Sequence, residues 1–79
     1  MKLNIYKHII DTYEKGYEWS VRGLKPSPSM LDIYETMDGL LRQVCDDDEI
    51  SDREFKEIFV RMANLRHNSY MSVKEGRKK

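Results

Sequence analysis

Apolar side chains recur every three or four residues along three segments of this chain, and that spacing constrains its fold more than any other feature. It is the period of an amphipathic helix, and it predicts helices over residues 3–22, residues 30–45 and residues 51 to about 67 or 70. Nothing in the sequence indicates a strand. Three amphipathic helices with short connections pack most simply as an up-down-up bundle, so we expect an all-α, three-helix fold.

The apolar stripes define the expected core. The first helix contributes Leu3, Tyr6, Ile9, Ile10, Tyr13, Tyr17, Val21 and Leu24. The second contributes Met30, Ile33, Tyr34, Met37, Leu40, Leu41, Val44 and Cys45. The third contributes Phe55, Ile58, Phe59, Met62 and Ala63, with Leu65 at the edge. Arg66 falls on the third stripe, so its charged end is expected to reach round to solvent.

The chain has 79 residues, a length at which one hydrophobic core is only just sufficient. We therefore expect a single three-helix domain over residues 1–72, followed by a basic tail over residues 73–79 that frays. Small cores often gain stability by association, so a homodimer is an open alternative to a monomer.

The first connection, residues 23–29, contains both prolines of the chain and cannot be helical throughout. Gly23 suits the C-cap of the first helix, and either Pro28 or Ser29 suits the start of the second. Gly16 lies inside the first helix, where glycine costs about 1 kcal/mol relative to alanine. It marks either a break or a place where another backbone approaches closely. The apolar stripe keeps its phase across Gly16, which favours a continuous helix.

Residues 46–55 allow two interpretations. In one, Ser51 is the N-cap of the third helix, Glu54 closes a capping box, and Ile50 packs against Phe55. In the other, the segment forms part of an EF-hand calcium loop, whose end it resembles. That alignment puts an aspartate where the loop needs glycine and lacks two of the expected carboxylate ligands. We therefore predict a helix start and no metal site.

The net charge of zero conceals a strong segregation of charge along the chain. Residues 1–25 carry five basic and three acidic groups, a net +2; residues 26–54 carry two and nine, a net −7; residues 55–79 carry seven and two, a net +5. This pattern excludes a uniformly basic nucleic-acid binder and allows a protein with one acidic and one basic surface.

The acidic run precedes the third helix and consists of Asp46, Asp47, Asp48 and Glu49. Negative charge is favourable at a helix N-terminus, so a solvated loop that helps start the helix is the simplest interpretation. The run carries more charge than capping requires. Its functional alternative is an acidic patch that a basic partner protein recognises.

No residue pattern indicates catalysis. His8 and His67 are the only histidines, and the one cysteine, Cys45, lies on an apolar stripe where a buried, unreactive thiol is expected. We predict no enzyme activity, no catalytic or metal-binding residue and no cofactor. The lone cysteine favours a reducing cytoplasmic location, and the absence of a long apolar run argues against a membrane protein.

The basic third segment makes nucleic-acid binding the alternative function. Its candidate phosphate contacts are Arg61, Arg66, Lys74, Arg77, Lys78 and Lys79. In a helix-turn-helix interpretation, however, the N-terminal end of the recognition helix would carry the acidic run into the groove, where it would repel DNA.

Trp19 is the strongest indication of a contact surface. On a continuous helix it lies roughly 140° from the centre of the apolar stripe, on the same side as Ile5. A bend at Gly16 would instead turn it inward. We predict a small protein-binding regulator, inhibitor or adaptor that uses Trp19, Ile5 or the acidic run. Compact, highly charged domains of this size are often encoded by phages or mobile elements that act on host proteins.

Overall fold

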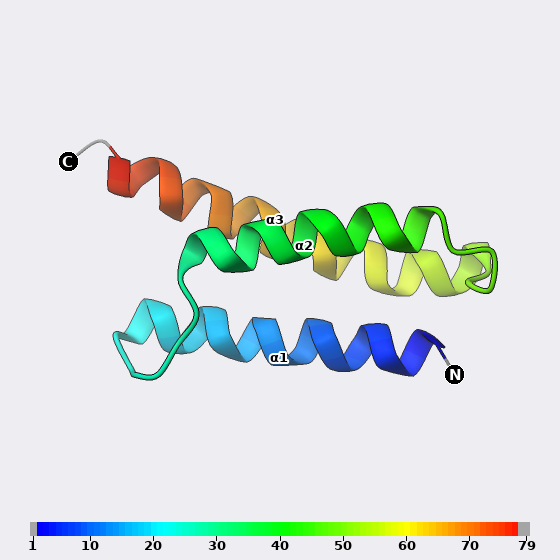
Figure 1. The fold of residues 1–79 in the computed structure, drawn as a ribbon, viewed down its shortest axis with the longest axis horizontal. Helices are drawn as coiled ribbons and strands as arrows, with labels where there is room; N and C mark the ends of the chain where they lie inside the picture. The colour runs from blue at the N-terminus through cyan, green and yellow to red at the C-terminus, as the bar shows by residue number, and fades with distance from the viewer. Residues whose placement is uncertain (1, 78–79) are drawn as a thin grey trace.

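The computed structural model of the chain describes residues 2–77, and these form three helices with no strand among them. Helix α1 spans Lys2–Arg22, α2 spans Met30–Cys45 and α3 spans Asp52–Arg77. Figure 1 shows successive helices running in opposite directions, so the all-α, up-down-up bundle is confirmed. Helices α2 and α3 pack closely over much of their length, while α1 lies against that pair and makes fewer contacts.

The connection after α1 begins with a Schellman motif. Gly23 has a φ of 74°, a conformation that glycine adopts without steric cost. Its N–H donates to the Ser20 carbonyl oxygen at 3.2 Å, and the Leu24 N–H donates to the Trp19 carbonyl oxygen at 2.9 Å. Ser29 then caps α2 by accepting the Asp32 N–H at 3.1 Å. The predicted glycine C-cap is confirmed, and Ser29 is the N-cap of α2.

Helix α1 is continuous through Gly16, as predicted, and the glycine is required by the first connection. A Cβ atom at this position would lie 2.7 Å from Cγ and 3.0 Å from Cδ of Pro28. The returning chain therefore passes so close to α1 that a side chain at position 16 would collide with the proline ring.

We expect Gly16→Ala to destabilise the protein by about 1 kcal/mol, because an overpacking cost of about 1–3 kcal/mol outweighs a helix-propensity gain of about 1 kcal/mol. Gly39→Ala in α2 is the matched control, since its Cβ would meet nothing within 4 Å and only the gain applies. Urea denaturation of both variants measures the change in the free energy of unfolding. The same measurement on Gly16→Ala combined with Pro28→Ala tests whether the proline ring causes the loss. A Gly16→Ala protein as stable as Gly39→Ala would contradict this account.

The start of α3 confirms the capping box. The Ser51 N–H donates to Glu54 Oε1 at 3.0 Å, and the Glu54 N–H donates to Ser51 Oγ at 3.2 Å. Ile50 and Phe55 both pack against the core, as the predicted staple requires. The Ser51 backbone N–H, and after it the Ser51 side chain, lowers the pKa of the Glu54 carboxyl.

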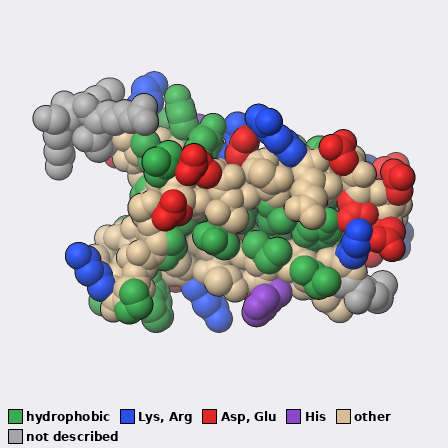
Figure 2. All heavy atoms as spheres, viewed as in Figure 1, with side chains coloured by type: hydrophobic (Ala, Val, Ile, Leu, Met, Phe, Trp, Pro, Cys, Tyr) green, Lys and Arg blue, Asp and Glu red, His purple; other side chains and the backbone are tan. Residues whose placement is uncertain are grey.

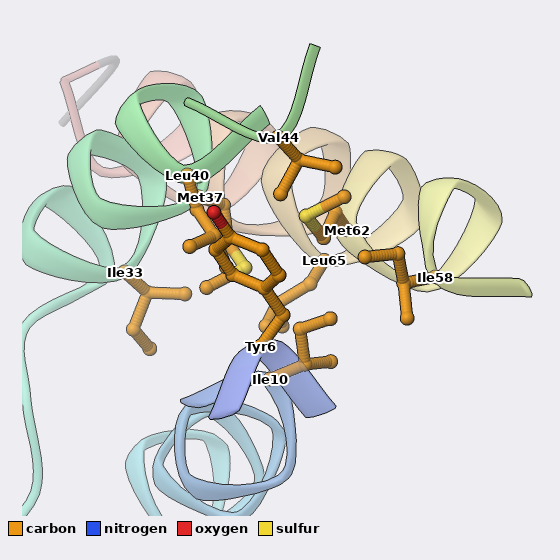
Figure 3. Packing of buried hydrophobic residues seen from close by; sticks show 9 residues of the cluster. All are labelled: Tyr6, Ile10, Ile33, Met37, Leu40, Val44, Ile58, Met62 and Leu65. Carbon is orange, nitrogen blue, oxygen red and sulfur yellow. The ribbon is translucent and has the colours of Figure 1, made fainter. Parts of the chain in front are cut away.

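Among the described residues, nine buried side chains form the core, and Figure 3 shows them converging from all three helices. They are Tyr6 and Ile10 of α1, Ile33, Met37, Leu40 and Val44 of α2, and Ile58, Met62 and Leu65 of α3. Eight of these lie inside the predicted stripes. Leu65, expected at the edge, is only 5% exposed and belongs to the core.

Several residues predicted to be buried are exposed. Val21 and Leu24 lie beyond the packed part of α1, where α1 and the C-terminal part of α3 diverge (Figure 1). Phe59 is 42% exposed and Cys45 is also exposed, because both lie on the side of the α2–α3 pair that α1 does not cover. The prediction of a buried thiol at Cys45 is therefore wrong.

Helix α3 is longer than predicted. The sequence pattern ended it near residue 67 or 70, but it continues to Arg77, so residues 73–77 of the expected tail are helical. The helix is still packed where the pattern ended it, since Ser69 is fully buried and the ring of Tyr70 packs on that of Tyr34 with centroids 5.5 Å apart. Glycine and proline are absent from residues 52–75, so nothing local stops the helix. Lys78 and Lys79 lie outside the described residues.

Candidate functional site

The acidic run lies in the connection between α2 and α3, and Figure 2 shows acidic side chains gathered at that end of the molecule. Its four members do not share one environment. The Asp47 side chain is only 7% exposed, whereas Asp46, Asp48 and Glu49 are exposed. The run therefore divides into one largely buried carboxylate and three exposed ones.

Asp47 joins α1 to the α2–α3 connection. Its Oδ2 accepts the Tyr6 hydroxyl at 2.6 Å and lies 3.3 Å from Lys2 Nζ, while its Oδ1 accepts the Glu49 N–H at 3.0 Å. Lys2 also pairs with Glu49 at 2.6 Å. Asp47 and Glu49 thus help to attach the N-terminal end of α1 to the α2–α3 connection. The interpretation of the acidic run as a solvated loop did not predict this role.

These bonds shift the pKa values of the Asp47, Tyr6 and Lys2 side chains. The Tyr6 hydroxyl, followed by the Glu49 N–H, lowers the pKa of the Asp47 carboxyl. The same bond, reinforced by burial, raises the pKa of the Tyr6 hydroxyl. Glu49 and then Asp47 raise the pKa of the Lys2 amine. The cluster therefore favours an ionised Asp47 beside a protonated Tyr6 and Lys2.

Two of the candidate phosphate contacts are bonded to carboxylates of the same chain. Arg61 of α3 pairs with Asp11 and, at 2.6 Å, with Glu14, both on α1. The pKa of its guanidinium is raised, chiefly by Glu14 and then by Asp11. Arg66 donates from Nε to Asp38 Oδ1 of α2 at 2.9 Å. Both arginines thus hold helices together, although the sequence offered them as surface cations.

The other four candidate phosphate contacts lie further along the chain than Arg61 and Arg66. Lys74 is exposed on the last part of α3. Arg77 ends that helix, and Lys78 and Lys79 lie outside the described residues. Arg66 also lies over the ring of Tyr34, with Cζ 5.2 Å from the centroid. Its charged end therefore extends less far into solvent than the sequence pattern predicted.

Trp19 is 48% exposed and Ile5 is 58% exposed, both on α1. Fourteen residues of helix separate them, roughly 21 Å at 1.5 Å per residue. Polar residues such as His8 and Thr12 occupy the face between them. The structure thus leaves both side chains accessible but does not bring them together. Figure 1 shows the α2–α3 connection, which carries the acidic run, at the opposite end of the bundle from the C-terminal end of α1.

Trp19 is linked to Leu24, which is 46% exposed, through the backbone hydrogen bond from the Leu24 N–H to the Trp19 carbonyl oxygen. The two residues occupy the C3 and C″ positions of the Schellman motif, between which an apolar contact is frequent. Sequence reasoning placed Leu24 in the core because it continued the helical phase past Gly23. The glycine reverses the chain there, and Leu24 comes to the surface beside the end of α1.

Sequence reasoning missed the roles of Tyr6 and Lys2. One signal was available, because a buried tyrosine hydroxyl normally requires a hydrogen-bond partner. Nothing in the sequence identified that partner as Asp47, which is 41 positions away.

Comparison with protein families, curated proteins and solved structures found no match to the chain. Within residues 2–77, no group of three or more His, Cys, Asp or Glu side chains is placed to hold a metal ion. No helix in the same part of the chain is long and apolar enough to cross a membrane.

Proposed function

We propose that this protein is a small protein-binding regulator, inhibitor or adaptor without catalytic activity, and that Trp19 is the centre of its contact with a partner. The observation that carries the proposal is the continuity of α1 through Gly16, which leaves Trp19 pointing outward and 48% exposed. Tryptophan is among the residues most enriched in the energetic centres of protein interfaces.

The local geometry supports this role. The Schellman bonds at Gly23 and Leu24 hold the backbone at the end of α1 in one conformation, so the backbone that carries Trp19 and Leu24 loses little freedom when a partner binds. Lys15 and Lys25 are exposed near the pair. The surface therefore suits a partner that offers an apolar pocket with an acidic rim. A cytoplasmic location and a phage or mobile-element origin stay predictions, as does nucleic-acid binding, which no specific contact favours.

The test is an affinity capture from a lysate of the source organism, with Trp19→Ala compared with Ile5→Ala. Both substitutions remove an exposed apolar side chain from α1. We expect Trp19→Ala to weaken binding of the captured protein by about 30-fold, the effect of a 2 kcal/mol contact, and Ile5→Ala to change it little. Equal binding by the wild type and a folded Trp19→Ala variant would refute the assignment of Trp19.

A further inference from the structure

Helix α1 contributes a smaller share of the apolar core than α2 and α3 do. Within the part of the chain that the structure describes, Tyr6 and Ile10 are its two buried side chains, whereas α2 and α3 together contribute the other seven. Four further apolar side chains of α1 are only partly buried against the core: Leu3, Ile9, Tyr13 and Tyr17. Apolar burial therefore stabilises the pairing of α2 with α3 more than it stabilises the attachment of α1.

Charged side chains supply much of the attachment of α1. Across residues 2–77, every side-chain hydrogen bond or ion pair that joins α1 to the rest of the molecule includes a carboxylate. The pairs are Lys2 with Asp47 and Glu49, Tyr6 with Asp47, Lys7 with Glu57, and Arg61 with Asp11 and Glu14. In the same residues, α2 and α3 share one such pair, between Asp38 and Arg66. Charge thus carries a larger share of the attachment of α1 than of the pairing of α2 with α3.

The two ends of α1 are attached in different ways. The C-terminal end continues into residues 23–29, the connection to α2. The N-terminal end lies at the opposite end of the bundle, beside the α2–α3 connection, as Figure 1 shows. The first turn of α1 carries no acidic residue, and Lys2 lies there, where the helix dipole disfavours positive charge. Asp47 and Glu49 compensate that charge only while α1 is docked.

We propose that α1 opens as a unit, by turning about residues 23–29 while α2 and α3 stay paired, and that its charge pairs set how often it opens. Opening breaks the ion pairs of α1 and withdraws Tyr6 and Ile10 from the core. The Asp38–Arg66 pair joins α2 to α3 and stays intact. Segments with few buried apolar contacts open in this way at a lower free energy than that of global unfolding.

Native-state amide hydrogen exchange, followed by NMR, tests the opening. Ile10 reports on α1, and Met37 and Met62 report on α2 and α3; all three side chains are fully buried. We expect the Ile10 amide to exchange faster than the other two after correction for intrinsic rates, because a helix without its tertiary packing is marginal in water. Equal protection of the three amides would overturn the proposal.

Ionic strength tests whether charge holds α1 in place. Raising sodium chloride from about 0.1 M to about 1 M shortens the Debye length from about 10 Å to about 3 Å. Exchange of the Ile10 amide should become about threefold faster, since partly exposed ion pairs such as Lys2–Glu49 weaken. An exchange rate of Ile10 that salt does not raise would overturn the role of the charge pairs.

Two arginine variants distinguish the opening of α1 from unfolding of the whole domain. Arg61→Met removes pairs that both events break, so it should speed the exchange of Ile10, Met37 and Met62 by about fivefold. Arg66→Met removes a pair that only global unfolding breaks. It should speed Met37 and Met62 and leave Ile10 unchanged. Equal acceleration of all three amides by Arg66→Met would show a single cooperative unit and overturn the proposal.

Two further variants serve if either arginine variant unfolds. Lys7→Met replaces Arg61→Met, because the pair of Lys7 with Glu57 also joins α1 to α3. Tyr70→Ala replaces Arg66→Met, because the Tyr70 ring packs on Tyr34 between α3 and α2. All of these variants leave Trp19 unchanged, and Trp19→Ala breaks no charge pair of α1. The opening of α1 and the partner contact at Trp19 therefore fail or hold independently.

Discussion

Replacing Ile10 with alanine is expected to remove much of the stability of this protein. Ile10 is fully buried, and Figure 3 shows it pointing from α1 into the core between α2 and α3. Truncating a buried isoleucine costs about 2–5 kcal/mol, since apolar burial is lost and a cavity remains. A domain of this size has about 4–12 kcal/mol in total. Urea denaturation followed by circular dichroism should therefore show a much lower midpoint or an unfolded chain.

Ile5→Ala is the matched control for this prediction. It makes the same chemical change in the same helix and gains the same helix propensity, but Ile5 is 58% exposed. Its effect should stay within about 0.5 kcal/mol. Equal losses in the two variants would mean that α1 does not insert Ile10 into the core in solution.

Replacing Tyr6 with phenylalanine is expected to lower the Tm by roughly 5–10 °C. Phenylalanine fills the same space but leaves Asp47 without its 2.6 Å hydrogen bond, in a place where the carboxylate is little exposed. Tyr13→Phe is the matched control. Tyr13 is a half-buried tyrosine of the same helix, and its hydroxyl makes no hydrogen bond within the described residues. Thermal unfolding of both variants by circular dichroism gives the comparison, and an equal change in Tm would contradict the role of the bond.

The effect of Tyr6→Phe should depend on pH in a defined window. The folded pKa of Asp47 is depressed, so its contribution is present above the unfolded value of about 4 and is lost as pH falls through the lower, folded pKa. The folded pKa of Tyr6 is raised, so its contribution is present below the unfolded value of about 10 and is lost as pH rises through the higher, folded pKa. The difference in stability from the wild type should therefore be largest between about pH 4 and pH 10. A difference that stays constant below pH 4 would contradict this linkage.

Local interactions in this protein could be predicted from the sequence. Ser51 and Glu54 are three residues apart and bond to each other's backbone whatever the rest of the chain does. Ser29 and Gly23 act in the same way at the ends of α2 and α1. The helix starts and the existence of three apolar stripes follow from such short-range chemistry.

The candidate surfaces could be predicted only in part. The outward position of Trp19 followed from helical phase alone, once α1 was continuous. Its neighbour Leu24 did not, because the chain reverses at Gly23. The acidic run was visible as charge, but the sequence could not show that Asp47 bonds to Tyr6, a residue brought near it only by the packing of α1.

The sequence by itself determined where the helices of this protein begin, how they are capped and which residues are apolar. Only the tertiary structure decided how far each helix is rotated about its axis. A shift of one residue along an α-helix corresponds to a rotation of about 100°. That rotation buries Leu65 and exposes Phe59, two residues that the sequence pattern ranked the other way. The physical reason is that a broad apolar arc fits more than one rotation, and the packing of all three helices together selects among them.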